Sequence, residues 1–156
     1  MNFSRSVDAL SHSLASSQAR IFERSVALGI PSKQFVRCYL LSEEARQLDE
    51  LNLDVAGLSE EEIFDSIRVR IKTDRGGVYT FPVMHFMGYF YRSAAYLTGY
   101  SSKKLYQIIK PDLLNKNYPS LHALPIEEAV KEVFEVVGVE EEDKYALFKK
   151  IYRVDI

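Results

Sequence analysis

One segment near the middle of the chain constrains the fold more than any other. Residues 82–98 form an apolar stretch between Pro82, which suits the first turn of a helix, and Gly99, which suits a helix end. A helix that is apolar on nearly all sides has to be buried on nearly all sides. We therefore predict a buried central helix over 82–98. Its predicted core side chains are Val83, Phe86, Met87, Phe90, Ala94 and Leu97.

Most other apolar side chains also recur at spacings of three and four residues, the period of a helix. With 156 residues, the chain is predicted to form a single all-α domain of about seven helices. A short strand over 35–41 is an alternative, and 111–124 is predicted to be a connection with at most one helical turn. The expected helices cover approximately residues 3–28, 32–51, 59–73, 82–98, 102–109, 125–137 and 141–154.

Two pairs of segments resemble each other and occur in the same order. The sequence GIPSKQFVRCY at 29–39 resembles GYSSKKLYQII at 99–109, and LSEEEIFDSI at 58–67 resembles LPIEEAVKEV at 124–133. A duplication relating approximately 5–73 to 82–137, followed by the helix at 141–154, explains this order. Independent recurrence of the same helix-capping chemistry explains it as well.

The charges are segregated along the chain. Residues 68–117 contain 9 basic and 2 acidic side chains, whereas residues 1–67 contain 6 basic and 11 acidic ones. A basic middle region between acidic flanks suits a protein with one local anionic contact. The alternative is that buried helices and lysine-bearing loops happen to fall in the middle.

Within this basic region, AAYLTGYSSKKLYQIIK at 94–110 has a small residue at Ala95, a turn glycine at Gly99 and apolar residues at Tyr100, Leu105 and Ile108. The segment resembles the helix-turn-helix element of bacterial DNA-binding regulators. The resemblance implies a second helix facing the major groove and double-stranded DNA as the partner. The residues it assigns to DNA contact are Ser101, Ser102, Lys103, Tyr106, Gln107 and Lys110.

The alternative function is a helical interaction or homodimerisation module without catalytic activity. Tyrosines are concentrated between positions 79 and 118, and tyrosine is enriched at protein interfaces. An apolar seam also begins at Phe3. Both functions favour a homodimer or another protein partner. The predicted interface residues are Val7, Leu10, Leu14, Tyr89 and Tyr96.

No pattern of catalytic, metal-binding or cofactor-binding residues stands out. The three histidines are far apart in sequence, and the single cysteine excludes an internal disulfide. We expect a cytoplasmic protein that is not an enzyme and has neither a metal nor a cofactor. A third possibility is a pocket that the sequence does not reveal. Pro82, His85 and Arg92 interrupt the only candidate membrane segment, so no membrane association is expected.

Overall fold

The computed structural model describes residues 3–52 and 57–138 of the chain. Over these two ranges the chain forms eight α-helices and no β-strand, which confirms the predicted all-α fold. The helices are α1 (Ala9–Ala27), α2 (Ser32–Leu40), α3 (Glu43–Asp49), α5 (Glu60–Arg68), α6 (Phe81–Thr98), α7 (Ser102–Ile108), α8 (Pro111–Leu121) and α9 (Ile126–Val137).

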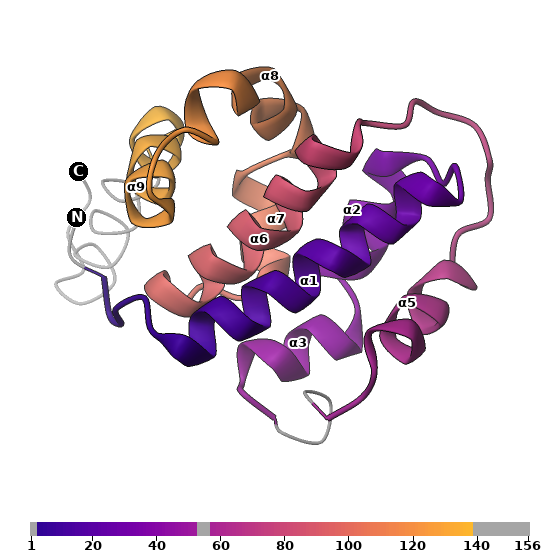
Figure 1. Ribbon diagram of the computed structural model, residues 1–156, viewed down its shortest axis with the longest axis horizontal. Coiled ribbons are helices and arrows are strands. Elements are labelled where there is room, and N and C mark those ends of the chain that lie inside the picture. Colours follow the sequence, from indigo (N-terminus) through magenta and orange to yellow (C-terminus); the bar gives the residue numbers. More distant parts are fainter. Residues whose placement is uncertain (1–2, 53–56, 139–156) are drawn as a thin grey trace, which may run out of the picture.

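Helices α1 and α6 pack side by side in opposite directions through the middle of the molecule (Figure 1). Near the start of α1, the Tyr96 hydroxyl donates a hydrogen bond of 2.8 Å to Asp8. Toward the end of α1, Glu23 lies 2.8 Å from His85, which belongs to the first turns of α6. Helices α7, α8 and α9 also contact α6. Helix α6 is therefore the central helix predicted over 82–98.

The two long helices approach most closely at Gly88. A Cβ atom placed on Gly88 would lie 2.6 Å from the carbonyl oxygen of Gln18 and 2.8 Å from Cα of Ala19. Real Cβ atoms do not approach backbone atoms this closely, so the crossing requires glycine. The Gln18 amide uses the close approach, because its Nε2 donates to the Gly88 carbonyl at 3.0 Å.

A buried ionic network joins four helices around Arg92, whose exposed fraction is only 2%. The Arg92 guanidinium donates to Gln18 of α1 at 3.0 Å and to Asp49 of α3 at 2.7 Å. Asp49 also accepts hydrogen bonds from the Ser102 backbone N–H at 2.7 Å and the Ser102 hydroxyl at 2.6 Å, at the start of α7. A buried charge is tolerated when it is paired and hydrogen-bonded, and this network meets both conditions.

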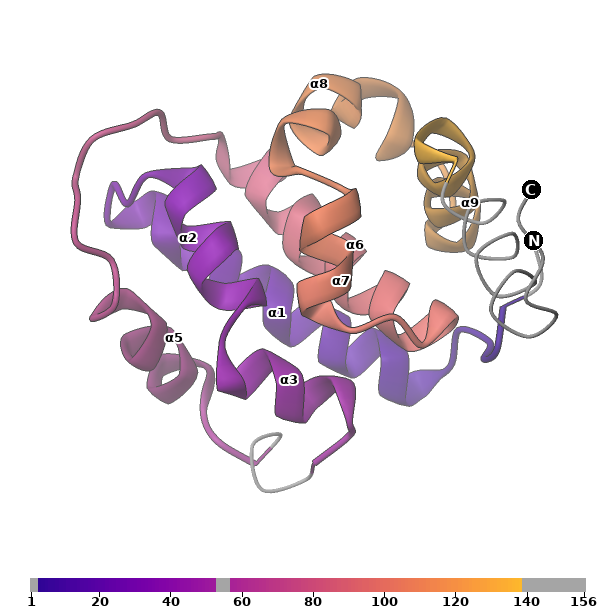
Figure 2. The ribbon, with the colours of Figure 1, turned by 180° about the vertical axis from the view of Figure 1, so that it is seen from behind.

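The two halves of the described chain follow the same plan. In each, a long helix (α1 or α6) leads through a left-handed glycine to a short helix (α2 or α7), and two more helices follow. The glycines are Gly29 with φ +65° and Gly99 with φ +80°. Figure 2 shows the short helices α2 and α7 lying side by side, and the two helices contact each other. This arrangement suits both explanations of the sequence resemblance, a duplication and an independent recurrence of the same helix-capping chemistry.

The first helix begins later than the apolar spacing predicts. Asp8 accepts a hydrogen bond of 2.8 Å from the Ser11 backbone N–H, and the Ser11 hydroxyl accepts one from the Asp8 N–H. This capping box starts α1 at Ala9. Phe3 and Val7 therefore lie outside the helix, and the predicted continuous seam was wrong at its first two positions.

Three other predicted boundaries were wrong. The helix expected over 59–73 ends at Arg68, so Ile71 lies beyond α5. The expected helix over 32–51 is two helices, because the chain turns at Leu41 and the Ser42 hydroxyl accepts from Ala45 N–H at 3.1 Å to start α3. The expected connection over 111–124 contains helix α8, which has Pro111 in its first turn and Pro119 inside it. The predicted helix over 141–154 lies outside the described residues.

The glycine at the helix crossing gives a direct test of this packing. We expect Gly88→Ala to lower the free energy of unfolding by about 3 kcal/mol, because the added methyl group overlaps the α1 backbone. Gly77→Ala is the matched control, since a Cβ there meets nothing within 4 Å. Urea unfolding of both variants measures the difference. Equal stability of the two variants would contradict the close crossing.

Candidate functional site

The corner between α6 and α7 has several features that the helix-turn-helix resemblance implies. Gly99 adopts the left-handed conformation at the turn, and Ala95 and Leu105 are buried. Tyr100 stacks on Phe134, with 5.7 Å between ring centroids. The helix before the turn is buried on most of its surface, however. The helix after the turn has only seven residues.

Ser102 does not point outward as the resemblance implies. Its exposed fraction is 1%, and Asp49 accepts hydrogen bonds from both its backbone N–H and its hydroxyl. The physical reason is the buried Arg92 guanidinium, which needs a carboxylate partner. Once Asp49 lies beside Arg92, Ser102 satisfies the remaining carboxylate lone pairs. The assignment of an outward, DNA-facing position to Ser102 is therefore corrected.

The other five assigned residues differ in exposure. Lys103, Gln107 and Lys110 are exposed and follow one another at spacings of four and three residues, so they form one stripe. Ser101 is exposed, but its hydroxyl accepts from the Lys104 N–H at 3.1 Å and caps α7. Tyr106 is half-buried against the core, with the Lys110 ammonium 3.9 Å from its ring centroid.

Helix α2 extends this stripe into a larger basic surface. In Figure 2, α2 and α7 lie in front of the two long helices, with α8 next to them. The ranges 32–41 and 101–121, which contain these three helices, include one acidic residue, Asp112. We call their exposed surface the basic face. Its basic side chains are Lys33, Arg37, Lys103, Lys104, Lys110 and Lys116.

Sequence reasoning did not include α2 in the candidate site. The signal that identifies it is the resemblance of 29–39 to 99–109, which aligns Lys33 with Lys103 and Arg37 with Gln107. All four of these aligned side chains, two on α2 and two on α7, are exposed. The two short helices therefore present similar side chains at equivalent positions.

The predicted interface residues also differ in accessibility. Val7 and Leu10 are exposed by 38% and 45%, whereas Leu14 is half-buried. Tyr89 is half-buried, and a hydrogen bond of 2.8 Å joins its hydroxyl to Nδ1 of His12. Tyr96 is buried, and its hydroxyl donates to Asp8. Tyr96 therefore supports the start of α1 from inside the fold, and its assignment to an exposed interface is corrected.

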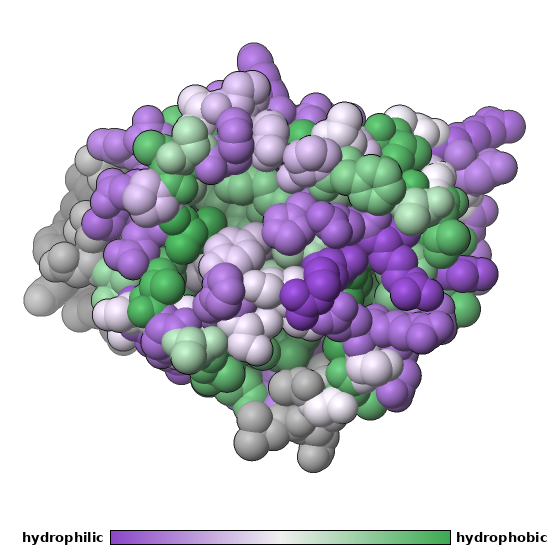
Figure 3. Space-filling model, viewed as in Figure 1, coloured by the Kyte–Doolittle hydropathy of each residue, from purple (hydrophilic) through white to green (hydrophobic). Residues whose placement is uncertain are grey.

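An aromatic groove of about 650 Å³ lies along α6 and continues to α8 and the start of α9. It opens as a hollow with apolar walls in the upper part of the space-filling view (Figure 3). His85 and Glu23 lie 2.8 Å apart on one side, and the rings of Tyr118 and His122 stack at 4.3 Å on the other. Other side chains that line it are Phe81, Pro82, Phe86, Tyr89, Leu124 and Ile126.

Within residues 3–52 and 57–138, no three His, Cys, Asp or Glu side chains gather in a way that would hold a metal ion. None of the helices in these ranges has the length and apolarity needed to cross a membrane. Comparison of the chain with protein-family models, curated proteins and solved structures gives no match.

The ionic network that positions α7 can be tested by removing its carboxylate. We expect Asp49→Ala to lower the free energy of unfolding by about 3–5 kcal/mol, because the buried Arg92 loses its partner. Glu50→Ala is the control, because Glu50 pairs with Arg46 at the surface, where ion pairs contribute about 0–1 kcal/mol. Denaturant unfolding measures both. A small, equal effect of the two substitutions would contradict the buried network.

Proposed function

We propose that this protein binds double-stranded DNA through the basic face. The observation that carries the proposal is the composition of that face, which combines six basic side chains with one acidic side chain from three neighbouring helices. Lysine and arginine side chains bind the phosphate backbone, and this contact supplies most of the non-specific affinity for DNA.

The pairing of the charges supports the proposal. Between α1 and α5, Arg20 pairs with Glu60 at 2.6 Å and Arg24 with Glu61 at 3.5 Å. On the basic face, Lys33 pairs with Asp112 at 2.9 Å. Among the described residues no ion pair neutralises the other five basic side chains of this face. Their charge is therefore available to an anionic partner.

The proposed mode of binding differs from that of a helix-turn-helix regulator. The Asp49 carboxylate of α3 accepts the hydrogen bond of the Ser102 N–H at the start of α7, where such a regulator inserts its second helix, so this N–H is not available to a phosphate. Contact through Lys103, Lys110 and Arg37 would be made mainly with phosphates. Gln107 is the exposed side chain of α7 suited to hydrogen-bonding a base edge. We expect binding that depends strongly on salt and weakly on sequence.

Fluorescence anisotropy with a labelled DNA duplex at several salt concentrations tests this function. We expect Lys103→Ala combined with Lys110→Ala to weaken binding and to reduce the salt slope by about two, or about one per lost phosphate contact. The matched control is Arg46→Ala combined with Lys131→Ala, which removes the same charge from exposed ion pairs on α3 and α9.

Three results would refute the proposal. The first is absence of binding by the parent protein at low salt. The second is an unchanged salt slope in the Lys103 and Lys110 double variant. The third is an equal loss of affinity in the control, because that would reflect net charge and not this face.

A second candidate function is homodimerisation, with the aromatic groove or the exposed start of α1 at the contact. The specific observation is the exposure of large apolar side chains there: Phe81 by 51%, Leu10 by 45% and Leu124 by 38%. Exposed apolar patches with polar rims often mark protein interfaces. Two copies of this chain would bury such a patch symmetrically.

Sedimentation of single variants distinguishes the two surfaces. We expect Phe81→Glu to separate a dimer formed through the groove, and Leu10→Glu to separate one formed through the start of α1, because a buried carboxylate destabilises an apolar contact. Val69→Glu is the control, since Val69 is exposed by 69% outside both surfaces. A parent protein that stays monomeric at all concentrations would exclude this function.

A further inference from the structure

All three histidines of the chain lie in or beside the aromatic groove, although they are far apart in sequence. His85 and His122 line the groove. His12 lies beside it, because a hydrogen bond of 2.8 Å joins its Nδ1 to the hydroxyl of Tyr89, which is also a lining residue. The fold therefore brings polar side chains from α1, α6 and the end of α8 to one mostly aromatic surface.

The histidines of the groove offer hydrogen-bond acceptors. Nδ1 of His122 lies 2.7 Å from the Tyr118 carbonyl, and Nδ1 of His85 lies 2.8 Å from the Glu23 carboxylate. Because carbonyl and carboxylate oxygens only accept, these Nδ1 atoms carry the ring protons. In the neutral rings both Nε2 atoms are then acceptors. Both rings are exposed, and neither Nε2 atom has a hydrogen bond within the described ranges. The groove thus suits a ligand that donates hydrogen bonds.

Glu23 gives the groove a negative charge that a ligand can reach. Among the described residues that line the groove, Glu23 is the only aspartate, glutamate, lysine or arginine. Its side chain is 38% exposed. Its Oε1 accepts from His85, and its Oε2 has no hydrogen bond or ion pair in the part of the chain that the structure describes. This oxygen is therefore available to a positively charged donor.

The rings of the groove are not occupied by the protein's own cations. Elsewhere, the Lys110 ammonium lies 3.9 Å from the ring centroid of Tyr106, and the Arg5 guanidinium lies 4.9 Å from that of Tyr96. No lysine or arginine of the described residues lies over a ring that lines the groove. Because the face of an aromatic ring attracts cations, these rings favour a cationic ligand. The phenyl and phenol rings of the groove are Phe81, Phe86, Tyr89 and Tyr118.

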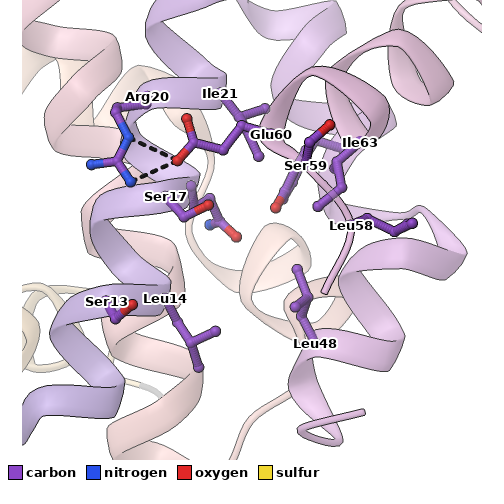
Figure 4. Close-up of a pocket in the computed structure, with 12 residues that line it drawn as sticks. Ser13, Leu14, Ser17, Arg20, Ile21, Leu48, Leu58, Ser59, Glu60 and Ile63 are labelled. Atoms are coloured by element: carbon purple, nitrogen blue, oxygen red, sulfur yellow. Dashed lines mark hydrogen bonds and ion pairs between the residues drawn. The ribbon is translucent and has the colours of Figure 1, made fainter. Parts of the chain in front are cut away.

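Another hollow, between α1, α3 and α5, has a different distribution of charge (Figure 4). The close-up shows Arg20 and Glu60 at its edge, and 2.6 Å separates their charged groups. A cation that approaches this edge is attracted by the carboxylate and repelled by the guanidinium. The aromatic groove has a carboxylate without a lysine or arginine. It is therefore the hollow that selects for positive charge.

We propose that the aromatic groove binds a small organic cation with an aromatic body and an ammonium group. The aromatic body packs against Phe86 and Tyr118, and the ammonium donates a hydrogen bond to Glu23. Because the groove is open to solvent (Figure 3), the ammonium keeps part of its hydration while the body is covered. The volume of about 650 Å³ is typical of small-molecule sites. The proposal does not rest on DNA binding, since no side chain of the basic face lines the groove.

Two probes that differ in charge test this site by NMR titration of the full chain. Tryptamine and indole-3-propionate share an indole ring, but one is a cation and the other an anion. We expect tryptamine to bind with millimolar affinity and to shift the amide signals of His85, Tyr89 and Tyr118. We expect indole-3-propionate to bind at least about 5-fold more weakly, because Glu23 repels its carboxylate.

Three variants separate the contribution of charge from that of the rings. We expect Glu23→Gln to weaken tryptamine binding by about 5-fold and to remove most of the difference between the probes. Glu61→Gln is the matched control, because it removes the same charge from an exposed pair with Arg24 outside the groove. It should leave both affinities unchanged. We expect Phe81→Ala to weaken both probes by a similar factor, because it removes a ring and no charge.

Four results would overturn the proposal. The first is absence of tryptamine binding, which is also the result if a second copy of the chain covers the groove. The second is a set of shifts confined to residues outside the groove, such as Ser13 and Ser17 of the hollow in Figure 4. The third is equal affinity of the two probes for the parent protein. The fourth is an equal effect of Glu23→Gln and Glu61→Gln on tryptamine binding.

Discussion

The close contact between the backbones of α1 and α6 is the constraint on which the rest of the structure depends. Because Gly88 has no side chain, Gln18 comes near enough to bond both the Gly88 carbonyl and the Arg92 guanidinium. Arg92 in turn pairs with Asp49, and Asp49 holds the start of α7 through Ser102. One small residue thus allows a chain of polar contacts that runs from α1 through α6 to α3 and α7.

The similar order of helices in the two halves does not make their short helices chemically equal. Ser32 and Ser102 occupy the same position, the first residue of α2 and α7, and both are buried. The Ser32 hydroxyl accepts a hydrogen bond of 2.7 Å from the Tyr79 backbone, whereas Ser102 contacts the Asp49 carboxylate. The two short helices are alike on their solvent-exposed sides, where Lys33 of α2 and Lys103 of α7 are both exposed. This shared side makes the basic face continuous over two helices.

The sequence predicts elements whose signals are local and fails where the partner is distant. The capping box that starts α5 joins residues only three positions apart, with the Ser59 hydroxyl accepting from the Glu62 N–H at 3.0 Å. The burial of Ser102 was not predictable, because its partner Asp49 is 53 positions away. Local patterns therefore predict helices well and sites poorly.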